Sequence, residues 1–427
     1  MRVGENFCPG VLHAVQAKDG LLIRIRVPGG LIEANQLRTI ADLSRSYADE
    51  TIEITSRANL QLRAIQNQDL SYIVESISSA GLLPSPQHDR VRNIVTSPIA
   101  GLDGEELIDP RPLIHELDRR LRADTAFVNL HPKFSFAIHG STRRFNRDHD
   151  DISLEAVDLD SASHFRLSIG GTSLGFVVQP ADAVDCMLAA AKMCIGLALE
   201  CSTPVRAKAV VTIPDALKRI VDALSHLLTP SPVSPPPCIV NEALIGIYPT
   251  TQDGRVSIIP SVPLGRLNPE QARYLADTSD EWEGDLRLAP WRGVVLGSIP
   301  KSAAGNIIGQ LRTVGLSCEG RDGFQGIAAC AGIAGCDASL ADVRGDAASL
   351  AQRLSGHAVP SGWTVNLSGC DKQCARRHGA TAELVADLSG YTLNIAGRRV
   401  ASNCSREFAL DAVAALHKNL LSEVAAR

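Results

Sequence analysis

The stretch LLIRIRV at residues 21–27 is followed by a Gly29-Gly30 turn, by ANQLRTIADLSRSYA (34–48), and by TIEITS (51–56) and NLQLRAI (59–65). LLIRIRV, TIEITS and NLQLRAI alternate apolar and polar residues and are rich in β-branched side chains, so they predict strands. The stretch 34–48 has apolar residues at helical spacing and predicts a helix. A strand, a helix and a returning strand with a further closing strand are typical of a ferredoxin-like α+β half.

The same order of elements returns in the second part of the chain. VSIIPSV (256–262) precedes Gly265 and NPEQARYLAD (268–277), and DLRLAP and GVVLGSI follow. A shift of 235 residues places QLRTIAD (36–42) on QARYLAD (271–277) and Arg57 on Arg292. So short a match can arise by chance, but the shared order of strand, turn, helix and strand favours a duplicated module.

Composition narrows the class of protein. The chain has 427 residues, enough for about two to four domains. Hydrophobic residues make up 45% and charged residues 21%, as in ordinary globular proteins. The net charge of -5 and the 4% of aromatic residues disfavour a nucleic-acid partner. No apolar run is long enough to span a membrane, and the first residues lack a signal peptide, so we expect no membrane partner and a cytoplasmic location.

The clearest break in the chain is TPSPVSPPP at residues 229–237, which predicts a stiff linker. We therefore expect two ferredoxin-like halves, each followed by a larger α/β lobe. The expected bounds are 1–80 for the first half, 81–228 for the first lobe, 238–303 for the second half and 304–427 for the second lobe. Within the lobes, FVNLHPKFSFAIHG (127–140) predicts a pair of strands, and residues 180–200 and 406–427 predict helices.

Four of the 11 cysteines form a pattern of metal ligands. Cys330 and Cys336 bound CAGIAGC, and Cys370 and Cys374 bound CDKQC. Thiolates suit iron–sulfur clusters or zinc, and the small residues between them allow loops to wrap a 4Fe-4S cluster closely. Structural zinc usually prefers the shorter C-x2-4-C spacing. The alternative is four buried, unpaired cysteines. Of the other cysteines, Cys8, which precedes Pro9, is the least explained.

Cationic residues recur where loops meet strands. Arg57 and Arg63 flank Asn59 and Gln61 in TSRANLQLR (55–63), Arg92 opens RNIVTSPIAGLD (92–103), and Lys133 lies in HPKFSF (131–136). Any one of these residues alone is best interpreted as a solvated surface charge. Together they predict a site for a polyanionic ligand, since the guanidinium group binds carboxylates through two hydrogen bonds.

With these motifs the sequence resembles the sulfite and nitrite reductase superfamily over nearly its whole length. In that superfamily C-x5-C and C-x3-C hold a 4Fe-4S cluster beside a bound sirohaem. The resemblance implies an α+β, pseudo-twofold fold with two ferredoxin-like halves and two larger α/β lobes. The superfamily motifs T-x-R-x-N-x-Q and R-N match at Thr55, Arg57, Asn59, Gln61, Arg92 and Asn93.

Three positions depart from the reductases. Ser135 replaces the second lysine of their K-F-K motif, Lys372 replaces the asparagine between the last two cysteines, and Arg63 replaces a histidine. These departures, together with FCPG (7–10), are similar to the cobalamin-pathway branch of the superfamily, the precorrin-3B synthases.

The resemblance to this branch implies an oxidoreductase, a monooxygenase of aerobic cobalamin (vitamin B12) biosynthesis. Its reaction is the oxygen-dependent C20 hydroxylation of precorrin-3A with formation of a γ-lactone. The partners would then be precorrin-3A and dioxygen, and no sirohaem is expected. The implied cluster ligands are Cys330, Cys336, Cys370 and Cys374, and the implied substrate-binding residues are Arg57, Asn59, Gln61, Arg63, Arg92, Lys133 and Lys372. No residue is assigned as the catalytic acid or base.

Several partners and alternatives stay open. The chain has no G-x-G-x-x-G fingerprint, so we expect an external electron donor, either an NADH-linked reductase or a ferredoxin. The branch has been linked to a mononuclear non-haem iron, but spacing singles out none of His131, His139, Asp148 and His149 as ligands. The alternatives are a sirohaem-dependent sulfite or nitrite reductase and a non-enzymatic protein that binds a tetrapyrrole or an iron–sulfur cluster.

Overall fold

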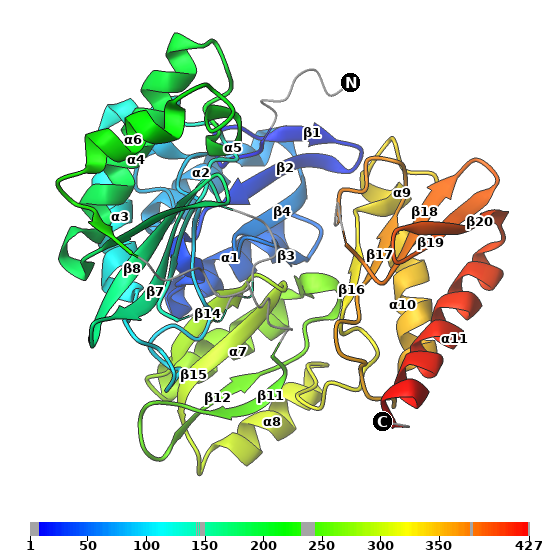
Figure 1. Cartoon of the computed structure of the whole chain (residues 1–427). Helices are drawn as coiled ribbons and strands as arrows, with labels where there is room; N and C mark the ends of the chain where they lie inside the picture. The colour runs from blue at the N-terminus through cyan, green and yellow to red at the C-terminus, as the bar shows by residue number, and fades with distance from the viewer. Residues whose placement is uncertain are drawn as a thin grey trace.

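Four β-sheets organise the chain in the computed structural model, which describes residues 8–141, 143, 145, 150–231, 244–375 and 379–425. Two of the sheets belong to the ferredoxin-like halves at the centre of the molecule, and each of the others forms the body of a lobe (Figure 1). No helix of the described chain is long and apolar enough to cross a membrane.

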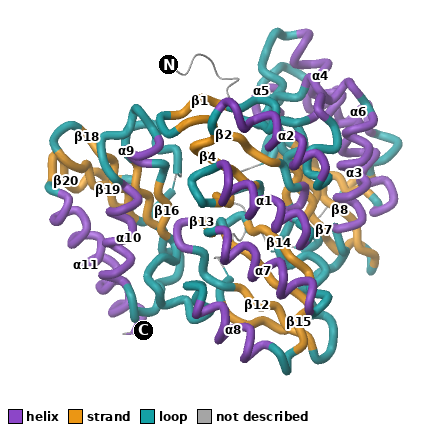
Figure 2. The backbone as a smooth tube through the Cα atoms, turned by 180° about the vertical axis from the view of Figure 1, so that it is seen from behind, coloured by secondary structure: helices purple, strands orange, loops and turns teal. Residues whose placement is uncertain are grey.

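The first half carries its two helices on one sheet, and the second half repeats this arrangement (Figure 2). The first half comprises β1 (Val15–Ala17), β2 (Gly20–Ile25), α1 (Ala34–Tyr47), β3 (Ile52–Ile54), β4 (Leu60–Ile65) and α2 (Leu70–Ser79). The second comprises β11 (Gly246–Pro249), β12 (Arg255–Ile259), β13 (Arg266–Leu267), α7 (Pro269–Glu281), β14 (Asp285–Ala289), β15 (Gly293–Pro300) and α8 (Ala304–Thr313). The sheet orders are β1-β2-β4-β3-β13 and β11-β12-β15-β14.

The structure confirms the predicted duplication, down to its irregularities. The pairing of β2 with β4 shifts register between Leu21 and Ile23, and the pairing of β12 with β15 shifts between Val256 and Ile258, which are 235 residues further on. Gln36 and Gln271 each complete a capping box at the start of α1 and α7. Gly30 and Gly265 have φ of 68° and 70°, a conformation that favours glycine in the turn before each helix.

Each half contributes a segment that pairs with a strand of the other half, so the two halves form one body. β13 of the second half pairs antiparallel with β3 of the first. Leu31 of the first half forms the reciprocal bridge to Arg287 in β14. Helices α1 and α7 pack together, and the apolar residues of both halves form a single core.

The two lobes also share one topology, so the duplication extends beyond the ferredoxin-like halves. In each lobe three parallel strands lead into two antiparallel ones, one helix follows the first strand and another follows the last. The first lobe has β5 (Ile94–Val95), α3 (Arg111–Ala123), β6 (Phe136–His139), β7 (Ile152–Leu159), β8 (Ala162–Ile169), β9 (Thr172–Val178) and α4 (Ala183–Glu200). The second has β16 (Ile327–Ala329), α10 (Val343–Leu354), β17 (Val365–Ser368), β18 (Ala382–Asp387), β19 (Gly390–Ile395), β20 (Arg398–Cys404) and α11 (Arg406–Ala425).

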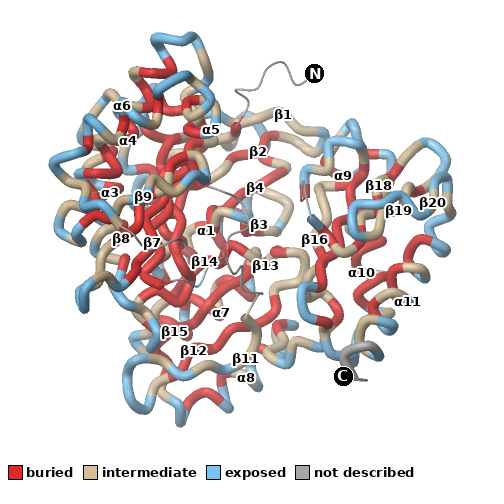
Figure 3. The backbone as a smooth tube through the Cα atoms, viewed as in Figure 1, coloured by how far each residue is buried: buried red, intermediate tan, exposed pale blue. Residues whose placement is uncertain are grey.

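Smaller elements complete the first lobe: α5 (Ala207–Val210), α6 (Ala216–Leu224) and β10 (Thr229–Pro230), which pairs with β9. Each lobe has its own apolar core, and Figure 3 shows the buried segments gathered on the sheets and on the helices that cover them. The helices predicted at 180–200 and 406–427 are confirmed as α4 and α11.

One strand prediction in the first lobe is wrong in part. Within 127–140 only β6 is a strand, whereas Thr125–Asn129 forms a 3-10 helix. Asp124 caps this helix by accepting a hydrogen bond from the Ala126 backbone, and this local bond outweighs the strand preference of the apolar residues.

Most of the linker predicted at 229–237 lies outside the described residues. The predicted boundary between residues 303 and 304 falls at the start of α8. Because the repeat relates α8 to α2, we propose that α8 belongs to the second half, which then ends after Thr313.

Candidate functional site

The four predicted ligand cysteines lie on two loops at one edge of the second lobe's sheet. Cys330 directly follows β16, and Cys370 follows β17 after one residue. Because β16 and β17 are parallel neighbours, their carboxyl ends bring the two loops together. The loops also bond to each other, since the Gly369 N–H donates to Cys330 Sγ at 3.3 Å and the Leu340 N–H donates to the Gly369 carbonyl at 2.7 Å.

The thiols of these loops lie close enough together for their charges to interact. Burial raises the pKa of the Cys370 thiol, and the charges of Cys374, Cys336 and Cys330 raise it further. Among the residues that the structure describes, no three His, Cys, Asp or Glu side chains are already drawn together as a metal-ligand group. Ligation therefore requires these thiols to turn inward. Cys374 is exposed and the other three are half-buried, so packing leaves room for that movement.

The loops fit a bulky sulfur-ligated group in other respects. Two glycines lie where neighbouring groups approach closely: a Cβ on Gly369 would lie 1.8 Å from Ser339 Oγ, and one on Gly335 would lie 2.5 Å from a terminal nitrogen of Arg63. Four thiols on small-residue loops with an inward N–H are the donor set that suits a 4Fe-4S cluster. The residues present therefore fit this cofactor.

Each ferredoxin-like half holds one cysteine loop by its backbone. From the first half, Arg63 donates to the Gly335 carbonyl at 2.6 Å, and Lys18 Nζ donates to the Ile333 carbonyl at 2.8 Å. Both carbonyls belong to α9 (Gly332–Gly335), the short helix between Cys330 and Cys336. From the second half, Arg292 donates to the carbonyl of Ala375, which follows Cys374. These contacts fix both cysteine loops against the central body.

The guanidinium group of Arg63 is thus already bound by partners within the protein. It forms two hydrogen bonds with the Asp19 carboxylate, at 2.9 and 3.0 Å, besides its bond to Gly335. Burial lowers the pKa of Arg63, but the hydrogen bond to Asp19 and the charge of Glu53 outweigh it and raise the pKa overall. We now interpret Arg63 as a positioning residue for the cysteine loop.

Arg57 differs from Arg63 and Arg92 because it forms no ion pair among the described residues. It lies in the turn between β3 and β4, is half-buried, and its buried Nε has no hydrogen-bond partner. Two arginines that the sequence analysis did not single out lie near it: Arg24 of β2 and Arg26, which directly follows that strand. The charges of these arginines act on one another. The signal was present in LLIRIRV: charges two residues apart on a strand share one face, and a buried strand has no structural need of them.

Asn59 and Gln61 orient the backbone and the neighbouring cations. Asn59 Oδ1 accepts a hydrogen bond from the Val27 N–H at 2.8 Å, and its Nδ2 reaches Asn93 Oδ1 at 3.5 Å. Gln61 Oε1 accepts from Arg24 at 2.9 Å. The structure therefore brings the stretches 55–63 and 92–103 together, as the prediction of one cationic site required.

The remaining predicted residues lie in different surroundings. Arg92 is buried in a two-bond ion pair with Asp118, at 2.6 and 3.0 Å, so its charge is already compensated. Lys133 is half-buried shortly before β6, and Lys372 is exposed between Cys370 and Cys374. His131 and His139 lie on either side of Lys133, with the Lys133 N–H donating to His131 Nδ1 at 3.1 Å. Asp148 and His149 lie outside the described residues.

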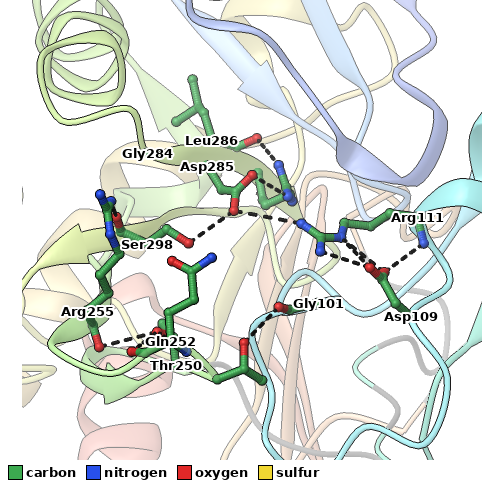
Figure 4. A network of polar contacts seen from close by, with 12 residues as sticks. Gly101, Asp109, Arg111, Thr250, Gln252, Arg255, Gly284, Asp285, Leu286 and Ser298 are labelled. Carbon is green, nitrogen blue, oxygen red and sulfur yellow. Dashed lines mark hydrogen bonds and ion pairs between the residues drawn. The ribbon is translucent and has the colours of Figure 1, made fainter.

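The loop after β5 meets the second ferredoxin-like half through polar contacts. Arg111 pairs with Asp109 at 2.8 Å and lies 3.9 Å from Asp285 of β14 (Figure 4). The Thr251 hydroxyl donates to the Gly101 carbonyl at 3.3 Å. This loop of the first lobe is thus attached to the central body, as the cysteine loops of the second lobe are.

Two family descriptions match the chain. The nitrite/sulfite reductase ferredoxin-like half domain matches residues 13–80 and 248–314, and the nitrite and sulphite reductase 4Fe-4S domain matches residues 87–177. Together they span slightly more than half of the 427 residues. The chain belongs to the nitrite/sulfite reductase superfamily. The segment 87–177 contains no cysteine, and the cysteine loops lie in the second lobe, which repeats the topology of the first.

Similar proteins include members with different named activities. A ferredoxin–nitrite reductase of Synechococcus elongatus is 28% identical over 78% of this chain and 69% of its own length. A precorrin-3B synthase of Sinorhizobium sp is 28% identical over 81% of this chain and 73% of its own length. The solved structure of the Mycobacterium tuberculosis NirA protein superposes with a TM-score of 0.76 at 21% identity, over 92% of this chain and 79% of that one. This likeness confirms the predicted fold.

Proposed function

We propose that this oxidoreductase is a precorrin-3B synthase, a monooxygenase that hydroxylates precorrin-3A at C20 and closes a γ-lactone in aerobic cobalamin biosynthesis. The observation that carries the proposal is the surroundings of Ser135, the position where the reductases that the sequence resembles have their second lysine. Ser135 is 0% exposed, and its N–H donates to Asp151 Oδ2 at 3.1 Å. Asp151 in turn pairs with Arg206 at 2.9 Å. This position therefore serves the core and presents no cation to a small anion.

The available cations suit a ligand with carboxylate arms. Arg57 would bind a carboxylate of precorrin-3A through its guanidinium group, with Arg24 and Arg26 adding positive charge beside it. Gln61 accepts a hydrogen bond from Arg24, which fixes that cation before the ligand arrives, and Asn59 ties the backbone near Arg57 to Val27. Fixed cations lose little side-chain entropy on binding, which favours affinity.

Cys330, Cys336, Cys370 and Cys374 would hold a 4Fe-4S cluster, which supplies single electrons when bound. Arg63, Lys18 and Arg292 fix the loops that carry these thiols. The ferredoxin-like halves would therefore set the distance between the cluster and the bound precorrin-3A. Of the two oxygen atoms of dioxygen, one would enter the product and one would leave as water. The two electrons required would come from an external donor, and the named relatives favour a ferredoxin.

The test uses the protein purified without oxygen. We expect iron–sulfur absorption and EPR signals without sirohaem bands. With a reductant, dioxygen and precorrin-3A, mass spectrometry should show a product that has gained one oxygen atom from labelled dioxygen. Absence of turnover in a protein that retains its cluster would contradict the proposal and favour a non-enzymatic binding protein.

A second candidate function is ferredoxin-dependent nitrite reduction. It is favoured by the several ferredoxin-dependent nitrite reductases that align with much of this chain, including one of Haloferax mediterranei at 25% identity over 76% of the chain. Sirohaem bands in the purified protein, with nitrite reduction driven by reduced methyl viologen, would establish this function in place of the first.

A further inference from the structure

Cys8 lies among three arginines and serves no role in the proposed reaction. Arg26 approaches Cys8 Sγ at 3.6 Å through one terminal nitrogen, and Arg24 approaches it at 3.8 Å. Arg57 lies near enough for its charge to act on the same sulfur. We refer to Cys8, Arg24, Arg26 and Arg57 as the Cys8 site. Two cations contact the thiol and a third adds positive charge, so the site favours an anion.

The guanidinium groups of the Cys8 site have bonding capacity left over. Arg26 is 2% exposed, and its Nε and one terminal nitrogen have no hydrogen-bond partner. The Nε atoms of Arg24 and Arg57 are also buried without a partner. Buried donors of this kind cost free energy unless they face a charge or a ligand. The cost is offset if Cys8 carries a negative charge.

The backbone around Cys8 is held in place. Asp89 accepts hydrogen bonds from the Val11 and Leu12 N–H groups, both at 2.9 Å, and pairs with His13 at 3.1 Å. Arg26 also donates to the Pro9 carbonyl at 3.3 Å. A Cβ on Gly10 would lie 2.1 Å from Asp89, so the chain passes this carboxylate closely. These contacts fix the thiol toward the arginines.

We propose that Cys8 is a modification site: a thiolate, held by Arg24, Arg26 and Arg57, that reacts with small electrophiles and with peroxide. The thiolate is the reactive form of cysteine, and neighbouring cations favour it. With hydrogen peroxide the sulfur attacks one oxygen, the O–O bond breaks, and the departing hydroxide takes a proton from solvent to form water. The sulfur is oxidised by two electrons to a sulfenic acid and the peroxide is reduced.

The charges around Cys8 agree with this assignment. Burial raises the pKa of the Cys8 thiol, but the charges of Arg26, Arg24 and Arg57 outweigh burial and lower it overall. Arg24 comes from β2, Arg26 directly follows that strand, and Arg57 comes from the turn before β4. Two carboxylates act on these cations: the charge of Asp89 favours the cationic form of Arg26, and the charge of Glu53 favours that of Arg24. By contrast, burial raises the pKa of Cys318 to about 11.

The experiment measures iodoacetamide labelling of each cysteine by peptide mass spectrometry, across pH, in the folded whole chain. The midpoint of the Cys8 profile reports its pKa independently of how easily the reagent enters, which matters because Cys8 is only 5% exposed. We expect a midpoint below the ordinary ~8.5, and a shift upward by about one unit in Arg57→Gln. Arg26→Gln should shift it further, while Cys201, which is exposed, serves as the internal reference.

Peroxide gives a second readout. Capture of sulfenic acid by dimedone should mark Cys8 several-fold faster than Cys318. A Cys8 midpoint at or above ~8.5, a profile unchanged in Arg57→Gln, or no labelling of Cys8 before unfolding would each overturn the proposal. None of these measurements depends on the reaction proposed above, so this site and that function can fail separately.

Discussion

The two lobes have the same order of strands and helices but opposite chemistry in their loops. After β16 and β17 the second lobe carries four cysteines and many small residues. The loops after β5 and β6 of the first lobe carry no cysteine. Loop 96–110 accepts a hydrogen bond from Thr251 of the second ferredoxin-like half, and Arg111, at the start of α3, lies near Asp285 of that half. The comparison shows that the duplicated scaffold fixes where loops meet, while the loop sequences decide which of them hold a cofactor.

The two lobes also differ in the contacts that attach them to the ferredoxin-like halves. The cysteine loops are held by hydrogen bonds to their backbone carbonyls from buried Arg63, half-buried Arg292 and exposed Lys18. These contacts leave the thiols unengaged. The first lobe is joined partly by a small apolar cluster of Ile99, Leu102, Phe145, Ile259 and Val295. A loop that ligates a cofactor needs its side chains for that purpose, so its backbone has to carry the attachment.

The largest expected effect comes from breaking the cysteine pattern. Cys330→Ser should abolish the iron–sulfur absorption and lower the yield of folded protein, because ligation of the cluster contributes to folding. Cys201→Ser, on the exposed end of α4 in the first lobe, is the matched control and should change neither. Iron and sulfide analysis alongside optical spectra makes the measurement. Full cluster content in Cys330→Ser would refute the ligand assignment.

The next prediction tests whether Arg63 of the first half positions the cysteine loop. Arg63→Met should lower the free energy of unfolding by about 3 kcal/mol, because it leaves Asp19 and the Gly335 carbonyl without their partner. It should also change the EPR spectrum of the cluster. Arg92→Met should cost less stability, since Asp118 keeps its pair with Arg122 at 3.0 Å, and it should leave the cluster spectrum unchanged.

Denaturant unfolding and EPR of both variants decide this comparison. If Arg92→Met perturbed the cluster spectrum as much as Arg63→Met, the special role of Arg63 in positioning the loop would be wrong.

A smaller effect separates the cationic site from the cluster. Arg57→Ala should weaken binding of precorrin-3A about tenfold, the effect of losing one charge-assisted contact, and leave the cluster spectrum intact. Its half-buried side chain forms no ion pair among the described contacts, so little stability should be lost. Titration followed by tryptophan fluorescence measures the affinity. Unchanged affinity would remove Arg57 from the binding site.

The smallest effect concerns Glu106 in the first lobe's loop. Burial raises the pKa of this carboxyl to about 7, against the lowering effect of a hydrogen bond from the Gly101 N–H. Folding therefore favours the protonated form, so its contribution is complete below pH ~4.5 and is lost as the pH rises through 7. Screening at this half-buried site limits the change to about 1 kcal/mol. Glu106→Gln should flatten this part of the stability curve, as thermal unfolding at several pH values will show.

The sequence predicted the fold better than the site. The repeat of strand, turn and helix could be predicted because apolar periodicity and turn residues are local signals. The structure adds that the register irregularities of the two halves also lie 235 residues apart. The site was harder to predict because an arginine's role depends on its partner. Arg63 and Arg92 have the same local sequence signal as Arg57, yet Asp19 and Asp118, from distant segments, engage them.

By itself, the sequence determined the α+β class, the duplicated halves and the cysteine spacing, since each depends on residues close together in the chain. The tertiary structure decided which cations stay available, since pairing occurs between segments brought together only by folding. It also decided that each half holds one cysteine loop, through Arg63 and Arg292. Most of all it placed Cys8 beside Arg24, Arg26 and Arg57, because charges on segments distant in sequence converge only when the sheet forms.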